Sequence, residues 1–215
     1  MIALFDLDGT LTDPKVGITR SVQYALERLG RPVPEADALT WMIGPPLIAG
    51  FTELLGGTHD VQEAVRLYRE RYSDVGLFEN EVYAGIPAVL RQLRDQDLRL
   101  YVATSKLNVF ARRILENLNL AVYFDGIHGS VPGGTLDHKP ELLAHILSEY
   151  GIAASHSLMI GDRRHDIVGA HAVTMRGLGV LWGYGSPDEL EAAGADQLVE
   201  RPADLARTAL SMLNG

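Results

Sequence analysis

Short, mostly apolar runs recur along the chain and constrain its fold more than any other feature. They cover residues 2–5, 100–103, 158–160, 178–181 and 197–199. Runs without polar alternation indicate strands that are buried on both faces. Segments with helical spacing lie between them, at 87–96, 109–117, 139–150, 166–173 and 203–213. Strands that alternate with helices in this way predict an α/β fold with a doubly wound parallel sheet.

The segment from residue 16 to 81 interrupts this alternation. Its helical spacing continues over 18–29, 36–42, 47–55 and 61–72, with no convincing strand between them. An all-helical block between the first and second strands predicts a second, smaller domain on two connections, near 12–15 and 80–84. We therefore expect a core domain formed by 1–15 and 82–215, and an all-helical cap domain at 16–81.

Composition limits the chemistry and the partners. The 215 residues include no cysteine, which excludes thiol nucleophiles, disulfides, zinc ribbons and iron–sulfur clusters. With 19 basic and 28 acidic side chains, the net charge of −9 disfavours a nucleic-acid partner. No signal-like segment or long apolar stretch is found, so we expect a cytoplasmic protein without a membrane partner. Monomer and homodimer both stay open.

Two aspartates, Asp6 and Asp8, follow the first apolar run. Their i, i+2 spacing aims both carboxylates the same way from an extended backbone. Burying them at the carboxyl edge of a parallel sheet is costly unless a cation or a proton compensates. Gly9 then permits a tight turn, and the Thr10 hydroxyl can bind a phosphate. The alternative is an ordinary Asp-Gly turn with solvated carboxylates.

A second acidic pair, Asp162 and Asp166, follows the run at 158–160. One helical turn separates the two, so both can face the cavity of the first pair and bring up to four carboxylates together. Hard oxygen ligands in that number favour Mg²⁺. Alone, the two acids could equally be a helix cap and a first-turn acid that complements the helix dipole.

Phosphate-binding groups are expected at two further places. Thr104, Ser105 and Lys106 follow the second run, and Lys139 opens a helix. Each is weak evidence alone, because a Thr or Ser there is commonly a helix cap and a lone lysine is usually a surface group. Together they offer hydroxyls, backbone amides and ammonium groups, which a bound phosphate needs.

The order and spacing of these motifs resemble those of the haloacid dehalogenase-like (HAD) hydrolase superfamily across essentially the whole chain. The pattern is Asp-x-Asp-Gly-Thr, then Thr/Ser, then Lys, then Gly-Asp-x-x-x-Asp. The resemblance implies a Rossmann-like core in which Asp6 is the nucleophile that forms an aspartyl-phosphate and Asp8 is the general acid/base. It also implies that Thr104 and Lys139 are the catalytic phosphate ligands.

The metal site is likewise implied by the resemblance. Mg²⁺ is expected to be held by a carboxylate oxygen of Asp6, the backbone carbonyl of Asp8 and the first acid of the last motif, Asp162, with Asp166 as a further metal-site carboxylate. The proposed reaction also needs a cation, because a carboxylate can attack the phosphorus of a phosphate ester only when the repulsion between the two anions is neutralised.

The helical insert resembles the cap of one HAD class, which includes phosphoglycolate phosphatases and β-phosphoglucomutases. The segment from 104 to 139 looks closest to phosphoglycolate phosphatase-like and nucleotidase-like members. We therefore predict a Mg²⁺-dependent phosphatase acting on a small phosphorylated metabolite, either phosphoglycolate-like or a nucleoside monophosphate. A β-phosphoglucomutase-type phosphomutase and a non-hydrolytic phospho-acceptor signalling module are the alternatives. Ile43 and Gly44 are candidate substrate-binding residues of the cap, although Gly-Pro-Pro is equally a helix breaker.

Overall fold

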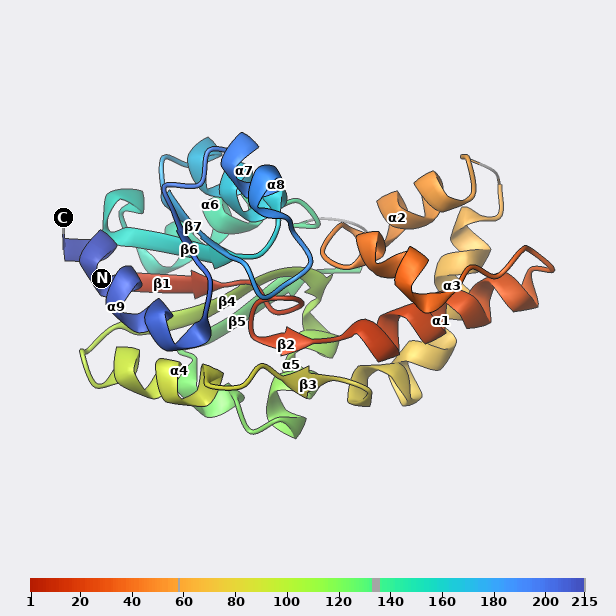
Figure 1. Cartoon of the computed structure of the whole chain (residues 1–215), viewed down its shortest axis with the longest axis horizontal. Coiled ribbons are helices and arrows are strands. Elements are labelled where there is room, and N and C mark those ends of the chain that lie inside the picture. Colours follow the sequence, from red (N-terminus) through yellow and green to blue (C-terminus); the bar gives the residue numbers. More distant parts are fainter. Residues whose placement is uncertain (58, 133–135, 215) are drawn as a thin grey trace.

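The computed structural model describes residues 1–57, 59–132 and 136–214, and its centre is a six-stranded sheet (Figure 1). The strands are β1 (Ile2–Phe5), β4 (Arg99–Leu107), β5 (Gly126–Ser130), β6 (Ser157–Gly161), β7 (Arg176–Val180) and β8 (Gln197–Val199). Their order is β5-β4-β1-β6-β7-β8, and every neighbouring pair is parallel. The predicted doubly wound parallel sheet is confirmed.

Helices cover both faces of this sheet. They are α4 (Ile86–Arg94), α5 (Asn108–Asn117), α6 (Lys139–Tyr150), α7 (Arg164–Ala172), α8 (Pro187–Ala192) and α9 (Pro202–Asn214), with short 3₁₀ turns at Ala121–Tyr123 and Ala154–His156. In β1, Ala3 and Phe5 join the hydrophobic cluster that includes α4, α5 and α9, whereas Ile2 and Leu4 join the cluster that includes α6 and α7. Burial on both faces explains why this strand shows no polar alternation. Within the described ranges, no helix combines the length and the apolar character needed to cross a bilayer.

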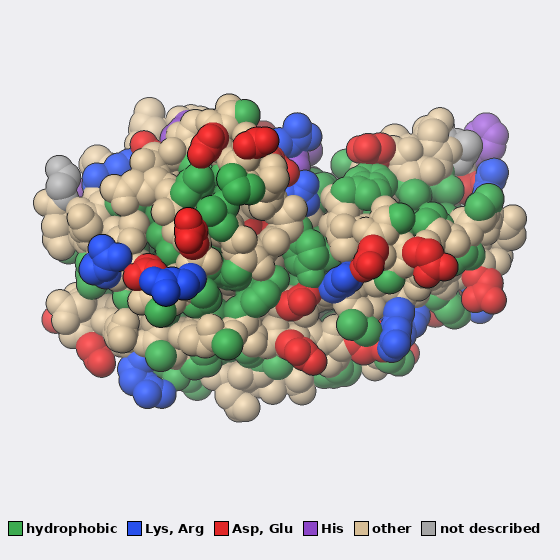
Figure 2. Space-filling model, viewed as in Figure 1, with side chains coloured by type: hydrophobic (Ala, Val, Ile, Leu, Met, Phe, Trp, Pro, Cys, Tyr) green, Lys and Arg blue, Asp and Glu red, His purple; other side chains and the backbone are tan. Residues whose placement is uncertain are grey.

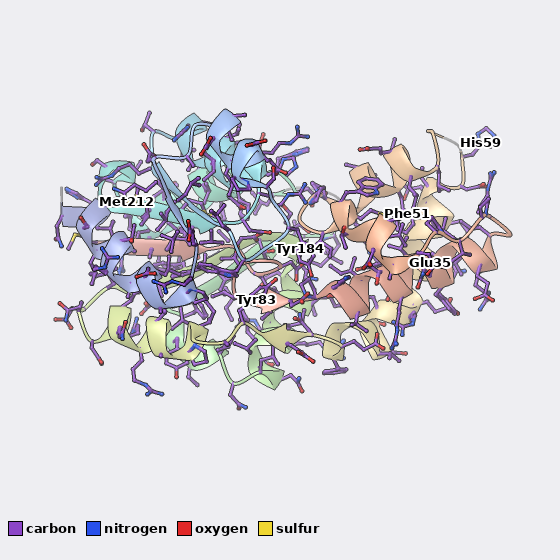
Figure 3. The ribbon with its side chains drawn as sticks, in the orientation of Figure 1. Glu35, Phe51, His59, Tyr83, Tyr184 and Met212 are labelled. Carbon is purple, nitrogen blue, oxygen red and sulfur yellow. The ribbon has the colours of Figure 1, made fainter. Side chains whose placement is uncertain are left out.

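A group of helices lies at the end of the molecule away from both termini (Figure 1). It comprises α1 (Lys15–Arg28), η1 (Ala36–Met42), α2 (Leu47–Leu54), α3 (Val61–Asp74) and η2 (Gly76–Phe78). We call residues 15–57 and 59–78 the helical lobe. Its interior contains Phe51 (Figure 3) and Tyr68, whose rings pack edge to face with centroids 6.0 Å apart. The domain boundaries at 16 and 81 stay a prediction.

Two short strands join the helical lobe to the rest of the chain. β2 (Thr12–Asp13) and β3 (Glu81–Val82) pair antiparallel, with Thr12 opposite Val82. Strands of two residues show no periodicity, so the sequence pattern did not predict them. The pairing brings the two connections side by side at one edge of the lobe.

The sequence pattern also missed β5 and α8. In β5, Ile127 stands among Gly126, His128 and Gly129, so no apolar run marks the strand. β5 forms an edge of the sheet, where only one neighbour is needed. The segment 36–42, predicted as helical, is a 3₁₀ helix.

Candidate active site

Three buried carboxylates meet where β1 and β6 end. Asp6 follows β1, Asp162 follows β6, and Asp166 lies in the first turn of α7. Each offers one oxygen, and these oxygens all lie within 4.8 Å of one another. Their residues are at most 4% exposed. β1 and β6 are neighbouring parallel strands, so their carboxyl ends bring the two acidic motifs together.

This acidic group carries more negative charge than the neighbouring Lys139 ammonium can neutralise. Burial, together with the charges of Asp166 and Asp6, raises the pKa of Asp162 well above its usual value. Burial also raises the pKa of Asp166 to about 6, although Lys139 acts in the opposite direction. Oδ1 of Asp6 and Oδ1 of Asp166 both lie against the Lys139 ammonium, so these two oxygens share one cation. Clustered carboxylate oxygens with spare lone pairs are ligands of the kind that Mg²⁺ prefers, so the residues fit this metal.

Lys139, at the start of α6, is the cation next to this group. Its Nζ lies 3.1 Å from Asp6 and 2.8 Å from Asp166, and it donates a hydrogen bond to the carbonyl of Ala103 at 2.8 Å. Burial lowers the pKa of Lys139, but the carboxylates of Asp166 and Asp6 raise it by more. The ammonium therefore stays charged and is held beside Asp6.

Asp8 does not join the carboxylate group, so the expectation that four carboxylates face one another is corrected to three. Its Oδ2 lies 2.8 Å from Nζ of Lys106, on β4. The chain turns directly after Leu7, whose carbonyl accepts from the backbone N–H of Thr10. The extended i, i+2 geometry assumed for the two aspartates therefore ends before Asp8. Burial raises the pKa of Asp8, and Lys106 opposes this rise.

Gly9 and Thr10 contact Asp162. The Thr10 hydroxyl donates to Oδ1 of Asp162 at 3.3 Å, so in this structure it orients a carboxylate. Gly9 has φ +84°, and a Cβ at this position would overlap the Asp162 carboxylate. The turn after β1 therefore needs glycine for both backbone conformation and space.

The loop after β7 also holds Asp162, and sequence reasoning missed it. The backbone N–H of Tyr184 donates to Oδ2 of Asp162 at 2.7 Å, and Trp182 Nε1 donates to the carbonyl of Thr10 at 3.0 Å. A Cβ on Gly183 would overlap the same carboxylate. Tyr184 donates to Asp13 and lies near Tyr83, where β2 and β3 meet (Figure 3). The signal was the alternation Trp-Gly-Tyr-Gly directly after a strand, which is typical of a close backbone approach.

A cavity of about 380 Å³ lies between the sheet and the helical lobe. Figure 2 shows the surface hollowed at this boundary. From the core it is lined by Asp6, Asp8, Thr104, Ser105, Lys106, Leu107, Phe110, Ser130, Val131 and Asp137. From the lobe it is lined by Ile18, Met42, Gly44, Pro45, Pro46, Leu47, Ile48, Gln62, Tyr68, Arg69 and Tyr72. The predicted phosphate-binding group at 104–106 and the predicted nucleophile thus share one cavity.

Of the two predicted substrate-binding residues in the lobe, only Gly44 lines this cavity. The Ile43 side chain is 0% exposed and belongs to the hydrophobic core. Its carbonyl accepts a hydrogen bond from Arg163, the residue after Asp162. Ile43 therefore fixes the lobe against the core.

An α/β fold with a buried acidic group beside a fixed lysine is typical of enzymes that transfer phosphoryl groups. The family model for haloacid dehalogenase-like hydrolases matches residues 3–180, and the chain belongs to this family. It is therefore an enzyme of the hydrolase class, as the motifs predict.

Relatives that are named as nucleotidases or phosphatases agree with this assignment. The chain is 50% identical to a 5'-nucleotidase of Pseudomonas aeruginosa over 190 residues, which cover 88% of this chain and 86% of the relative. It is 31% identical to a phosphoglycolate phosphatase of Aquifex aeolicus, over 96% and 95% of the two chains. The crystal structure of a predicted phosphatase from Clostridium acetobutylicum superposes with a TM-score of 0.95 at 40% identity, covering 98% of each chain. The predicted similarity to phosphoglycolate phosphatase-like members is confirmed.

Proposed function

We propose that this protein is a Mg²⁺-dependent phosphatase that hydrolyses a small phosphorylated metabolite through an aspartyl-phosphate. The observation that carries the proposal is the position of Asp6, which lines the cavity, directly follows the buried strand β1 and lies 3.1 Å from the Lys139 ammonium. The relatives support two substrate classes, since one is named a 5'-nucleotidase and another a phosphoglycolate phosphatase. We propose a nucleoside monophosphate or a phosphoglycolate-like ester as substrate.

In this mechanism a carboxylate oxygen of Asp6 attacks the phosphorus of the bound ester. Lys139 offsets the repulsion between the two anions and fixes the attacking carboxylate. We propose that Mg²⁺ is held by Asp6, Asp162 and Asp166 and by the backbone carbonyl of Asp8; when bound, it supplies positive charge that stabilises the phosphoryl oxygens.

The remaining steps use groups on the core wall of the cavity. Asp8 protonates the leaving alkoxide and later accepts a proton from the water that hydrolyses the aspartyl-phosphate. Thr104, Ser105 and Lys106 line the cavity beside Asp6 and bind the phosphoryl oxygens through their hydroxyl and ammonium groups. Gly9 and Thr10 act on this site through Asp162.

We further propose that residues 16–81 form a cap domain over a core of 1–15 and 82–215. The cavity has walls from both parts, and the two connections pair as β2 and β3. A lobe joined by two adjacent connections can move as a unit and exclude bulk water when it closes.

The decisive experiment measures phosphate release from a panel of phosphate esters with added Mg²⁺. Wild-type protein should release inorganic phosphate, and chelation should stop the reaction. Asp6→Asn should abolish it, while Asp95→Asn, an exposed acid at the end of α4, should not change it. Asp8→Asn should lower the rate by about 10²–10⁴-fold, since it chiefly impairs proton transfer. Substantial activity in Asp6→Asn would exclude the covalent mechanism, and phosphoryl transfer between sugars without net phosphate release would indicate a mutase.

A further inference from the structure

The arginines of the helical lobe differ in whether they have acidic partners. Five of the six pair with carboxylates at 3.7 Å or less, in the pairs Arg20–Glu79, Arg28–Glu70, Arg31–Asp60, Arg66–Glu63, Arg66–Glu70 and Arg71–Glu79. The sixth, Arg69 on α3, has no acidic partner among the described residues. It also has no hydrogen bond and no aromatic ring beneath its guanidinium within the described ranges. Among the described residues, Arg69 is therefore the lobe arginine without any of the usual partners.

Arg69 is also the lobe arginine that lines the cavity. Its Nε is buried and unpartnered in the described part of the chain. A buried donor without an acceptor costs free energy, and more so when it belongs to a charged group. The cost is offset when a ligand brings an acceptor oxygen into the cavity.

The surrounding side chains indicate which part of a ligand Arg69 contacts. At the core wall, Lys106 is already paired with Asp8, next to the proposed phosphate site. Arg69 belongs to the opposite wall, where Gln62 precedes it by two helical turns on α3 and also lines the cavity. Apolar side chains of the lobe complete this wall, at Met42, Leu47 and Ile48. A phosphate ester held by the core thus points its leaving group toward a guanidinium, an amide and an apolar surface.

We propose that Arg69 is a specificity residue that binds acceptor oxygens on the leaving group of the substrate. The inference rests on the proposed phosphatase function and names the substrate class more closely: phosphate monoesters with a second oxygen-rich group remote from the phosphate. Two sources share this chemistry, a carboxylate or second phosphate and the O6/N7 acceptor edge of a guanine base. The planar guanidinium can donate two parallel hydrogen bonds to either one.

The test compares esters that differ in this remote group. Phenyl phosphate has no acceptor beyond the ester itself, 2-phosphoglycolate has a carboxylate, and guanosine 5'-monophosphate has the O6/N7 acceptor edge that ribose 5-phosphate lacks. In Arg69→Met, kcat/KM for the preferred acceptor-bearing ester should fall about 10- to 100-fold, as expected for a lost hydrogen bond to a charged group. Phenyl phosphate should change less than about threefold. Arg69→Lys separates the sources, because an ammonium restores binding of a carboxylate better than bidentate binding of a base.

Arg66→Met is the matched control, because Arg66 lies on the same helix but is exposed and paired with Glu63 and Glu70. It should leave the ratio between esters unchanged. Three results would overturn the role of Arg69 but leave the proposed phosphatase function intact. They are an equal loss of activity on all esters in Arg69→Met, no loss on any ester, and a wild-type preference for phenyl phosphate. If wild-type protein hydrolyses none of the esters, the proposed function fails as well.

Discussion

The ammonium nitrogen of Lys106 lies 2.8 Å from Oδ2 of Asp8, and the two side chains are only 7% and 10% exposed. Lys106 belongs to β4 and Asp8 follows β1, so the pair joins two neighbouring strand ends. The Lys106 ammonium also donates to the hydroxyl of Tyr72 on α3. The proposed proton donor is therefore connected to the helical lobe through one lysine.

Replacing Lys106 by Met should destabilise the protein in a pH-dependent way. Asp8 would stay buried without its cation, and losing one partner of a buried pair costs about 3–5 kcal/mol. Burial without Lys106 places the pKa of Asp8 above its unfolded value, so the folded variant binds an extra proton. The loss of stability should thus be small at pH 5, where Asp8 can take that proton, and grow toward pH 8.

Urea unfolding at the two pH values checks this expectation. Lys15→Met is the control, because Lys15 pairs with Asp37 at the surface and its loss should matter little at either pH. A loss in Lys106→Met that is equal at pH 5 and pH 8 would show that Asp8 does not stay buried after the change.

Metal binding should depend on pH because two of the proposed ligands hold their protons unusually tightly. Burial and neighbouring carboxylates raise the pKa of Asp162, and burial raises that of Asp166 to about 6. Both must be ionised to bind Mg²⁺, so affinity should fall between pH 7.5 and 5.5 and binding near pH 6 should release protons. Titration calorimetry in buffers of different ionisation enthalpy measures this release. A binding heat that is the same in all buffers at pH 6 would contradict it.

Mg²⁺ should also stabilise the fold. Lys139 supplies one positive charge to the three carboxylates of Asp6, Asp162 and Asp166, which therefore still repel one another. A ligand at about 100 times its Kd that binds only the folded state adds roughly 2.7 kcal/mol. The melting temperature should rise with Mg²⁺ and not with NaCl of equal ionic strength. Equal melting temperatures in the two salts would argue against a preformed site.

The sequence was sufficient to predict five of the six strands of the sheet because these strands are marked locally. Residues 2–5 and 157–161 are buried on both faces, so nearly every position is apolar or small. β5 escaped prediction because its glycines and His128 at the sheet edge leave only one large apolar side chain. The paired strands β2 and β3 are too short to carry a pattern.

In the site, too, residues marked by a local motif were predicted, whereas contacts that depend on the path of the chain were not. Asp6, Lys139 and Asp162 were identified because each stands in a motif at a strand or helix end, and the parallel order of β1 and β6 makes their meeting predictable. The contact of Lys106 with Asp8 depends on where the chain turns after Leu7, which spacing alone does not set. That Arg69 has no partner among the described residues is visible only when the other lobe arginines are placed in three dimensions.

Gly183 should be needed to position Asp162. A Cβ there would overlap both the Asp162 carboxylate and the carbonyl of Gly9, so Gly183→Ala must displace one of them. We expect weaker Mg²⁺ binding and lower activity with an unchanged circular dichroism spectrum. Gly194→Ala is a control, because its φ of +83° brings backbone strain while only His171 is near it. If both variants lose stability but bind Mg²⁺ like the wild type, the loop does not position Asp162.

Truncation of the side chain to alanine should have different effects on stability and substrate preference at two nearby residues of the lobe. Ile43 is fully buried in the hydrophobic core, whereas Leu47 lines the cavity. Ile43→Ala should cost about 2–5 kcal/mol of stability and lower activity on all esters alike. Leu47→Ala should change kcat/KM for a bulky ester relative to a small one by the equivalent of about 1–3 kcal/mol. Melting temperatures and kcat/KM for both esters test this difference, and a changed preference in Ile43→Ala at unchanged stability would mean that Ile43 contacts the substrate after all.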